Sequence, residues 1–427
     1  MLHSKQQLIQ TLQGRDIVIW GARMTGMGFL RFSRANDLNV INFVDSDPAF
    51  TNKTLNSIPV YHPDRLKKQQ QENTNLLIVV AVSIKEEEII QSLTKMNFSK
   101  NDYMLYSDYC DSFYTIDVVG TCNLECPTCA HGITGAKPPR GMMAFEDFTR
   151  VIEKIKSEVE VLTHVSLYSW GEPLLHPKLP DIIKHLHKNG IAAAISSNLS
   201  IKSDDQLKRV IQASPEFFKV SLSGFYPETY NETHTGGDIN LVKSNLYRLK
   251  YYIEKYESNT FVDVNYHLYT NNNQKNLQKM QELCDELGFS LSATYSLIMP
   301  LERCLDHCNG IIDPQTEELQ KILLVDIDEG IEVTKDFRSS TCPFKENQTN
   351  INWDLSVPVC CTTFYKADTI VAKDYLKSDL SDIKREKDKA SICAECMHYG
   401  LPAYNMGFNQ SGWKKVAATK VSKDIKN

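Results

Sequence analysis

Six short apolar segments, each followed by an amphipathic segment, run through the middle of this 427-residue chain. The amphipathic segments have the period of helices, as in "NLQKMQELCDELG" at residues 276–288. Strands that alternate with helices form a parallel sheet, because each helix returns the chain to the same edge. Six units are too few for the closed eightfold barrel, so the repeat predicts an α/β fold with an open (β/α)6 partial barrel. The expected strands are 113–119, 164–169, 191–196, 217–223, 261–269 and 290–298.

Two of the expected strands carry polar residues on one face. Ser221 and Ser223 alternate with apolar residues in "FKVSLSG", and Asp263, Asn265 and His267 do so in "VDVNYHL". A strand buried on both faces of a parallel sheet is normally apolar throughout. The polar face therefore predicts a lumen that holds a polar ligand, with Asp263, Asn265 and His267 as candidate catalytic residues. The alternative is a face exposed to solvent outside the barrel.

Residues 1–109 have the pattern of a separate Rossmann-like α/β module. "DIVIWGARMTGMGFLRF" predicts a strand, a glycine turn and a helix, and a second strand ends at Asp45. Arg23 stands where a dinucleotide fingerprint has its middle glycine, so dinucleotide binding is not expected. Arg23 and the helix N-terminus could hold a phosphate or a sugar nucleotide, or the module could dock without a ligand.

Charge and hydropathy exclude several kinds of partner. The formal net charge of −6 argues against a nucleic-acid or polybasic membrane role. The longest apolar run, "LLIVVAV" at residues 76–82, is too short to span a bilayer, and the first residues lack the apolar core of a signal peptide. We therefore expect a cytoplasmic protein. In that compartment disulfides are disfavoured, so clustered cysteines indicate metal binding, whereas the isolated Cys110 and Cys284 are expected to be buried apolar residues.

Three cysteines follow the first strand of the repeat. "VGTCNLECPTCAH" places Cys122, Cys126 and Cys129 at CxxxCxxC spacing. A [4Fe–4S] cluster normally takes four thiolates, one for each iron, so three thiolates leave one iron open. An open coordination position distinguishes reactive metal sites from structural ones. The spacing thus predicts a cluster with a free corner; the alternative is a structural zinc loop with His131 as its fourth ligand.

The motif and its setting resemble the radical SAM enzymes. The three cysteines match the family's CxxxCxxC motif after the first barrel strand, and the resemblance covers about residues 113–297. It implies that S-adenosylmethionine is cleaved reductively to a 5′-deoxyadenosyl radical, which abstracts a hydrogen atom from a substrate, with a flavodoxin or ferredoxin as electron donor. "GEP" after the second strand matches the family's contact to the methionyl amino group, and further contacts are implied for ribose and carboxylate. The implied cofactor-binding residues are Gly171, Glu172, Pro173, Asn198, Ser221 and Ser223.

One residue departs from the family pattern. The residue before the third cysteine is often aromatic and packs near adenine, but here it is Thr128. The adenine contact is therefore expected to come from elsewhere in the chain.

A second group of cysteines lies near the C-terminus. Seventeen residues lie between Cys342 and Cys360, and Cys393 and Cys396 form a CxxC pair. Four thiolates in two halves suit a closed auxiliary [4Fe–4S] cluster. The arrangement resembles the truncated SPASM, or twitch, domain of radical SAM proteins, in which a hairpin lies between the first two cysteines. Zinc is the alternative at this site, and Cys361 could replace Cys360 as a ligand.

Cys304 and Cys308 have no assigned role. A second auxiliary cluster would need them together with Cys361 and another thiol, but the full seven-cysteine SPASM spacing is not present. The sequence thus predicts four segments: a Rossmann-like module at 1–109, a radical SAM partial barrel at 110–300, an auxiliary-cluster domain at 301–413 and a disordered tail at 414–427.

An auxiliary cluster could take an electron from a substrate radical, so the resemblance implies a net oxidation. A sugar, a cyclitol or a sugar nucleotide is the expected substrate. The alternative is a SPASM-type maturase that modifies a peptide. A third possibility, a non-catalytic binding protein stabilised by metal, conflicts with the intact CxxxCxxC and "GEP" motifs.

Overall fold

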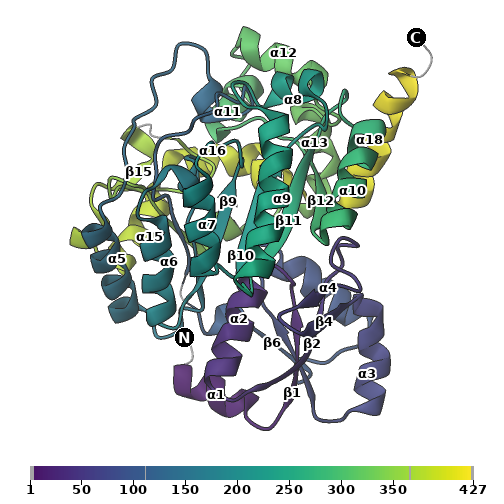
Figure 1. Ribbon diagram of the computed structural model, residues 1–427, viewed down its shortest axis with the longest axis vertical. Coiled ribbons are helices and arrows are strands. Elements are labelled where there is room, and N and C mark those ends of the chain that lie inside the picture. The colour runs from purple at the N-terminus through teal and green to yellow at the C-terminus, as the bar shows by residue number, and fades with distance from the viewer. Residues whose placement is uncertain (1–3, 111, 365–366, 425–427) are drawn as a thin grey trace.

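The computed structural model describes residues 4–110, 112–364 and 367–424, and its largest sheet is the expected partial barrel (Figure 1). The strands follow one another in chain order, and each neighbouring pair is parallel. All six predicted strands are present, which confirms the α/β fold with an open barrel. They are β7 (Phe113–Ile116), β8 (His164–Ser166), β9 (Ala192–Ser197), β10 (Phe217–Leu222), β11 (Phe261–Leu268) and β12 (Ser290–Tyr295).

Amphipathic helices cover the outer face of this sheet. Their apolar stripes pack on outward residues such as Val220, Leu222 and Val264, which are completely buried. Ser203 and Asp238 cap two of the helices by accepting hydrogen bonds from backbone amides of the first turn. The helices are α5 (Phe145–Glu158), α6 (Leu179–Lys188), α7 (Asp204–Ala213), α9 (Ile239–Lys255) and α10 (Lys275–Leu287). The short helix α8 (Pro227–Thr233) lies instead beyond the carboxyl end of β10.

A seventh strand, β13 (Gln348–Ile351), comes from the C-terminal part of the chain and pairs in parallel with β7. Its sequence "QTNI" lacks the apolar character that predicts a strand, yet Thr349, Asn350 and Ile351 are buried. Tertiary pairing therefore decides the structure here. Just beyond it, the Trp353 ring fills the space in front of Gly120 and Gly141, where a Cβ would lie 1.9 and 2.0 Å from indole atoms.

Residues 5–105 form a second α/β unit around a sheet of order β3-β4-β2-β1-β5-β6. The pairs β1–β2, β1–β5, β2–β4 and β5–β6 are parallel, and β3 adds an antiparallel edge, as in a Rossmann-like unit. Its elements are α1 (Lys5–Leu12), β1 (Asp16–Trp20), α2 (Met24–Ala35), β2 (Asn39–Val44), β3 (Thr54–Leu55), β4 (Ile58–Tyr61), α3 (Leu66–Glu72), β5 (Leu76–Val80), α4 (Glu86–Lys95) and β6 (Tyr103–Leu105).

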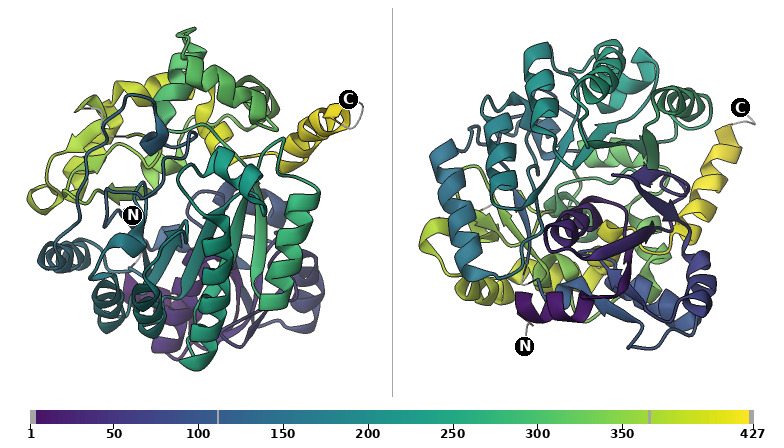
Figure 2. Two further views of the ribbon diagram at one scale, coloured as in Figure 1. Left: turned by 45° about the horizontal axis from the view of Figure 1, so that its top comes forward. Right: turned by 60° about the horizontal axis from the view of Figure 1, so that its bottom comes forward.

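The Rossmann-like unit covers the amino ends of the barrel strands (Figure 1 and Figure 2, right). Helix α2 packs on β8 and β9, and a Cβ at Gly28 would lie 2.7 Å from the Cβ of His164, so only glycine fits there. Arg23, at the carboxyl edge of the unit's own sheet, contacts Asp263 of β11. Arg23, the residue that could hold a phosphate or a sugar nucleotide, is thus paired with a carboxylate of the barrel. The unit is docked on the barrel, and whether it also binds a ligand stays a prediction.

The chain after β12 forms a layer of helices and short strands over the carboxyl ends of the barrel strands (Figure 1 and Figure 2, left). Its one hairpin among the described residues, β14–β15, begins before Cys360 and closes after it. The hairpin expected between Cys342 and Cys360 is therefore shifted along the chain, because β13 joins the barrel sheet instead. The elements are α11 (Leu301–Cys308), α12 (Pro314–Ile322), α13 (Ile327–Val333), α14 (Pro343–Glu346), β14 (Val357–Pro358), β15 (Ile370–Ala372), α15 (Leu380–Lys389), α16 (Ser391–Tyr399) and α17 (Leu401–Met406).

Helix α18 (Gln410–Asp424) corrects the expectation of a disordered tail at 414–427. The exposed lysines of this segment suggested disorder, but Trp413 and Ala417 are buried, and the Trp413 ring stacks on Tyr404 with centroids 5.7 Å apart. Trp413 and Ala417 are one helical turn apart, and this apolar stripe holds the helix on the protein. Residues 425–427 lie outside the described residues. Within the described part of the chain, no helix has the length and apolar character needed to cross a membrane.

Candidate functional site

The three cysteines Cys122, Cys126 and Cys129 lie on the loop that follows the carboxyl end of β7. The Cys129 amide donates a hydrogen bond to the Cys126 carbonyl at 2.9 Å, which turns the loop back on itself. Burial raises the pKa of all three thiols, that of Cys122 to about 12. Cys129 further raises the pKa of the other two, which requires the three sulfurs to be neighbours.

This set of thiols suits a cluster better than a single ion. A buried thiol with a raised pKa stays protonated at neutral pH unless a metal deprotonates it. Among the described residues, no three Cys, His, Asp or Glu side chains converge closely enough to hold one metal ion. A [4Fe–4S] cluster instead takes one thiolate at each iron, so its ligands need not meet at a single point. Three neighbouring thiols on one loop therefore fit three corners of a cluster, one thiolate at each of three irons.

His131, the candidate fourth zinc ligand, belongs to a group of rings beside the loop. It hydrogen bonds to the Trp170 backbone, and its ring lies 5.8 Å from that of Phe364. Phe364 in turn packs edge-on against Trp170 at 5.1 Å. These rings bring the segment after β8 and the C-terminal layer together at the cysteine loop.

The "GEP" segment passes directly behind the cysteine loop. A Cβ at Gly171 would lie 1.5 Å from the Val119 carbonyl oxygen, so only glycine permits this approach. Glu172 is 2% exposed and accepts hydrogen bonds from the amides of Leu174 at 3.0 Å and Asn198 at 2.8 Å. Burial raises the pKa of Glu172 to about 7. Its carboxyl group thus fixes the segment and lies near Cys122, whose pKa it also raises.

Asp117 is a site residue that the sequence analysis did not identify. It is buried at the end of β7, and its carboxyl oxygens accept from the amides of Trp170 at 3.1 Å and Gly171 at 3.4 Å. Burial raises the pKa of Asp117 to about 7. The signal was present as a polar residue closing an apolar strand, the place where ligand-binding residues of α/β sheets gather.

The structure brings Asn198 to the loop and separates the two serines. The Asn198 amide nitrogen lies 3.6 Å from the Cys122 sulfur. Ser221 faces the lumen and its hydroxyl lies 2.9 Å from His267 Nε2. Ser223 is completely buried, and its hydroxyl contacts Thr233 and the Nδ1 of His234. Ser223 is therefore not on the accessible wall.

Inward side chains of the barrel strands surround a solvent-accessible space. Residues on the helix side, such as Val220 and Val264, are fully buried, whereas inward residues of five neighbouring strands and their ends remain partly exposed. This alternation supports the lumen, not a polar outer face. The partly exposed inward residues are Tyr168, Ser196, Lys219, Ser221, His267 and Thr294.

The floor of the lumen is an ion-pair cluster between the two units. Arg23 Nη1 lies 2.9 Å from Asp263 Oδ2 and its Nη2 lies 2.5 Å from Asp47 Oδ2. Asp263 is 0% exposed and also accepts from the Ser292 hydroxyl at 2.6 Å. The adjacent Met24 sulfur accepts from the Ser166 hydroxyl at 3.2 Å. Asp263 is therefore a structural anchor with both oxygens occupied.

The other two catalytic candidates differ in access. Asn265 is buried, with its amide 3.4 Å from the Thr294 hydroxyl. His267 is partly exposed, and burial of its ring lowers its pKa to about 3. An imidazole with so low a pKa is neutral and a weak proton acceptor at neutral pH. The geometry thus gives none of the three candidates a free basic group.

Tyr269 contacts Thr128, the residue before the third cysteine of the loop. Its hydroxyl lies 3.1 Å from the Thr128 hydroxyl, and the Met299 amide donates to the Thr128 carbonyl at 2.9 Å. An aromatic ring is therefore present next to the third cysteine, although it comes from the end of β11. Sequence spacing could not reveal it, because the contact joins positions 141 residues apart.

The four C-terminal cysteines come from separate segments and meet. Cys342 caps α14, Cys360 follows β14, and Cys393 and Cys396 lie on α16. After burial, the charges of Cys360 and Cys342 raise the pKa of both Cys393 and Cys396, so the sulfurs are neighbours. Cys361 lies close to the same group, and burial raises its pKa well above the ordinary value. This set fits a four-thiolate cluster.

A buried lysine faces these C-terminal thiols. Lys387 of α15 is 2% exposed, and its ammonium donates to the Gln348 carbonyl. Burial lowers the pKa of Lys387 to about 8, while the neighbouring thiols of Cys360, Cys361 and Cys393 raise it. The sequence analysis missed Lys387 because a lysine in a Lys-rich helix is normally exposed.

The C-terminal layer reaches the barrel mouth through the residues after Cys361. The Leu301 amide donates to the Thr362 carbonyl at 2.8 Å, and the Phe364 amide donates to Glu302 at 3.1 Å. Burial also raises the pKa of Tyr168, with Cys361 among the contributing charges. The second thiol group therefore lies beside the lumen rather than on a remote lobe.

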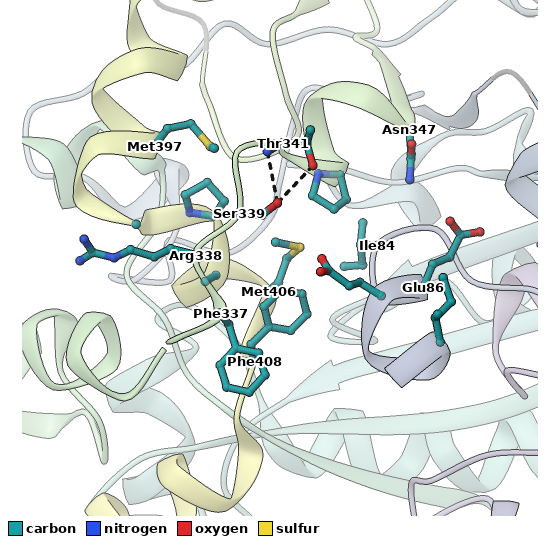
Figure 3. A pocket seen from close by; sticks show the side chains of 16 residues that line it. Ile84, Glu86, Phe337, Arg338, Ser339, Thr341, Asn347, Met397, Met406 and Phe408 are labelled. Carbon is teal, nitrogen blue, oxygen red and sulfur yellow. Dashed lines mark hydrogen bonds between the residues drawn. The ribbon is translucent and has the colours of Figure 1, made fainter. Parts of the chain in front are cut away.

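Two pockets open outside the lumen. A pocket of about 200 Å³ lies between α4 and the C-terminal layer, with Ile84 and Glu86 facing Phe337, Met406 and Phe408 (Figure 3). Its lining also includes the residues on both sides of Cys342. A second pocket, of about 270 Å³, lies at the barrel mouth between the end of the cysteine loop and α11. Its lining includes Ile133, Thr134, Glu302, Arg303, Asp306 and Phe364.

Comparison with known proteins gives matches over the barrel. Residues 116–286 match the profile described as "Radical SAM superfamily". The chain is 24% identical over 255 residues to the "Tungsten-containing aldehyde ferredoxin oxidoreductase cofactor-modifying protein" of Pyrococcus furiosus, covering 57% of this chain and 69% of that one. It is 25% identical over 209 residues to a "Probable GTP 3′,8-cyclase" of Methanococcus maripaludis, covering 49% and 66%. The chain thus spans about two thirds of these relatives.

Solved structures with a similar course of the chain include two with S-adenosylmethionine. "Native anSMEcpe with bound AdoMet" has a TM-score of 0.45 and 14% identity, covering 74% of this chain and 99% of that one. "Crystal structure of Streptococcus suis SuiB bound to S-adenosylmethionine" has a TM-score of 0.46 and 15% identity, covering 71% and 76%.

Proposed function

We propose, because residues 116–286 form a domain of the radical SAM superfamily, that this enzyme cleaves S-adenosylmethionine reductively and oxidises a hydroxylated small molecule by two electrons. The substrate class we propose is a sugar, a cyclitol or a sugar nucleotide. The observation that carries the oxidation is the second set of thiols, Cys342, Cys360, Cys393 and Cys396, which meets beside the lumen.

The residues around the cysteine loop have distinct tasks in this proposal. Cys122, Cys126 and Cys129 would hold a cluster with one open iron, which when bound supplies the electron that breaks the sulfonium C–S bond. Glu172 and Asp117 fix the "GEP" backbone behind the loop through their bonds to backbone amides. Asn198, at 3.6 Å from the Cys122 sulfur, and Ser221 on the lumen wall would face the bound S-adenosylmethionine.

The atoms and electrons of the proposed oxidation balance as follows for an alcohol. The carbon-bound hydrogen goes to the 5′-deoxyadenosyl radical, which leaves as 5′-deoxyadenosine beside methionine. The hydroxyl proton goes to a base or to water, and one electron goes to the cluster held by the C-terminal thiols. A ketone remains. The lumen walls exclude other hydrogen donors, because the Rossmann-like unit closes the floor and the C-terminal layer covers the mouth.

Modification of a peptide is the alternative reaction. One similar structure is the "Crystal structure of Streptococcus suis SuiB bound to precursor peptide SuiA", but no contact among the described residues favours a peptide over a small polar molecule. The hydroxyl-lined wall, with Tyr168, Ser196, Ser221 and Thr294, favours a hydroxylated ligand.

The experiment that tests the function uses the full chain reconstituted with iron and sulfide without oxygen. We expect about eight irons for each chain if both sites hold [4Fe–4S] clusters. With S-adenosylmethionine and dithionite, the enzyme should release 5′-deoxyadenosine, measured by liquid chromatography. Zinc in place of iron at the cysteine loop, or no release of 5′-deoxyadenosine from the iron-loaded enzyme, would contradict the proposal. Hydrogen transfer from deuterated sugars, cyclitols or peptides to 5′-deoxyadenosine then separates the substrate classes.

A further inference from the structure

Lys219 is a lumen residue that the site described so far does not use. It lies on β10 with the same inward orientation as Ser221 and stands level with Asp263 on β11 and Ser196 on β9. Its side chain remains partly exposed, although all three strands are central to the sheet. A lysine at such a position extends its ammonium group into the lumen rather than into bulk solvent.

The Lys219 ammonium has no partner of opposite charge. Among the described residues, none accepts a hydrogen bond from it or forms an ion pair with it. Its one contact of note is the ring of Tyr168, whose centroid lies 4.9 Å from Nζ. A cation over a tyrosine ring is held in place, but its three N–H donors stay free for a ligand.

The nearest carboxylate is already occupied by another cation. Asp263 accepts from Arg23 at 2.9 Å and from Ser292 at 2.6 Å, and Arg23 is also paired with Asp47. Arg23 therefore takes the direct contact that Lys219 could otherwise make. Lys219 keeps its charge in the lumen, one level below the Ser221–His267 pair.

A buried cation without a partner costs free energy, and a bound anion would offset that cost. Burial lowers the pKa of Lys219 to about 8; Arg23 lowers it further, and Asp263 raises it. The lysine is thus mostly charged at neutral pH, in surroundings that disfavour the charge. Such an ammonium binds a carboxylate or a phosphate more strongly than an exposed lysine does.

We propose that Lys219 anchors a binding site for an anionic group, a carboxylate or a phosphate, carried by the hydroxylated substrate. The proposal rests on the proposed function and narrows its substrate class. The neighbouring hydroxyls of Ser196 and Thr294 would face the hydroxyl groups of that substrate. Sugar acids, sugar phosphates and sugar nucleotides meet this description, whereas neutral sugars and aminocyclitols do not.

The competing role for Lys219 is that of a distant counter-charge. Asp263 and Asp47 carry two negative charges against the one positive charge of Arg23, and Lys219 could balance the remainder without binding a ligand. In that case an added anion would gain nothing at Lys219. The two roles therefore differ in whether small anions protect this lysine.

The test measures acetylation of Lys219 in the iron-loaded full chain by a small anhydride, read by mass spectrometry of the peptides. Inorganic phosphate and acetate are the probes, with chloride at equal ionic strength as the reference. A probe present at ten times its dissociation constant should slow acetylation of Lys219 about tenfold. Exposed Lys202 in the same sample should react at an unchanged rate. The probe that protects better identifies the anionic group as phosphate or carboxylate.

Two outcomes would overturn the proposal. One is no protection by either probe; the other is equal protection of Lys219 and Lys202, which would show an ionic-strength effect only. Ser221→Ala should keep the protection. In Lys219→Met, sugar phosphates or sugar acids should no longer stimulate release of 5′-deoxyadenosine. Basal release that is already absent in the wild type would instead contradict the proposed function, so the two failures are distinguishable.

Discussion

The chain holds two groups of cysteines that differ in number, origin and surrounding charge. Cys122, Cys126 and Cys129 share one loop, and the buried carboxyl groups of Glu172 and Asp117 raise the pKa of individual thiols there. The C-terminal four come from three segments, and buried Lys387 has the opposite effect on Cys360.

The difference indicates a direction for electrons. Negative groups near a cluster disfavour the addition of an electron, whereas a nearby cation favours it. In the proposed function, the loop site would therefore be the electron donor of low potential and the C-terminal site the acceptor. The three thiols of the loop would leave one iron open for a ligand, and the four C-terminal thiols would close their cluster. These expectations agree with the proposed oxidation, in which the second site takes up the electron that the substrate loses.

We expect the largest effect when a cysteine of the loop site is replaced and the C-terminal site is left intact. Cys126→Ala should abolish release of 5′-deoxyadenosine and remove about half of the iron, because the loop then offers only two thiolates. Iron analysis and chromatography measure both quantities. Cys284→Ala, which alters a buried cysteine on α10 away from both groups, is the matched control and should retain iron and activity. Full release of 5′-deoxyadenosine by Cys126→Ala would contradict the assignment of Cys126 as a cluster ligand.

The reverse experiment keeps the loop site and removes the other. Cys393→Ala combined with Cys396→Ala should also lose about half of the iron, yet basal release of 5′-deoxyadenosine should continue. Ketone formation from an accepted substrate should stop, because the electron has no acceptor. The comparison between the two sites fails if this variant loses all iron, or if the C-terminal site of the unmutated protein contains zinc.

A smaller effect tests the role of charge. Lys387→Met should lower the midpoint potential of the C-terminal cluster, by on the order of 100 mV for one buried charge. Redox titration followed by electron paramagnetic resonance measures the shift. Lys389→Met on the same helix, whose side chain is 61% exposed and paired with Glu386, should leave the potential unchanged. An unchanged potential in Lys387→Met would show that this lysine only supports packing.

The smallest effect concerns pH and the acids behind the loop. Burial raises the pKa of Glu172 from 4.5 to about 7, so the folded protein binds its proton more tightly than the unfolded chain. This contribution to stability is complete below pH 4.5 and is lost as the pH rises to about 7. It amounts to at most about 3 kcal/mol. Glu172→Gln should flatten the fall in melting temperature of the cluster-free protein between these pH values, and an unaltered slope would contradict the burial argument.

Local patterns in the sequence carried the prediction of the barrel and of the cysteine loop. Strand alternation and the CxxxCxxC spacing involve residues close in the chain, so the six strands were located before any contact was known. The pairing of β13 with β7 and of Arg23 with Asp263 joins residues more than 200 positions apart. Periodicity cannot predict such pairs, so the sequence left two roles open for Arg23, a ligand for a phosphate or a sugar nucleotide and a residue of a docked module without a ligand.

Buried charges were the second class of missed features. Lys387 stands in a Lys-rich helix whose composition indicates exposure, and Lys219 shares the polar face of its strand with Ser221. Only the tertiary contacts show that burial lowers the pKa of both side chains. Asp117 was missed for a related reason, because one carboxyl group at a strand end is ambiguous until the amides of Trp170 and Gly171 are seen to donate to it. The residue types were visible in the sequence, but their burial was not.

The docking of α2 under the barrel has a consequence for the sequence of events during turnover. Arg23 and Met24 close the amino ends of the strands, so a ligand reaches the lumen from the carboxyl ends, where the cysteine loop lies. A substrate that binds at the depth of Lys219 therefore passes the cysteine loop before S-adenosylmethionine occupies that loop. With an accepted substrate present, we therefore expect a high concentration of S-adenosylmethionine to slow turnover, because S-adenosylmethionine that binds first hinders entry of the substrate.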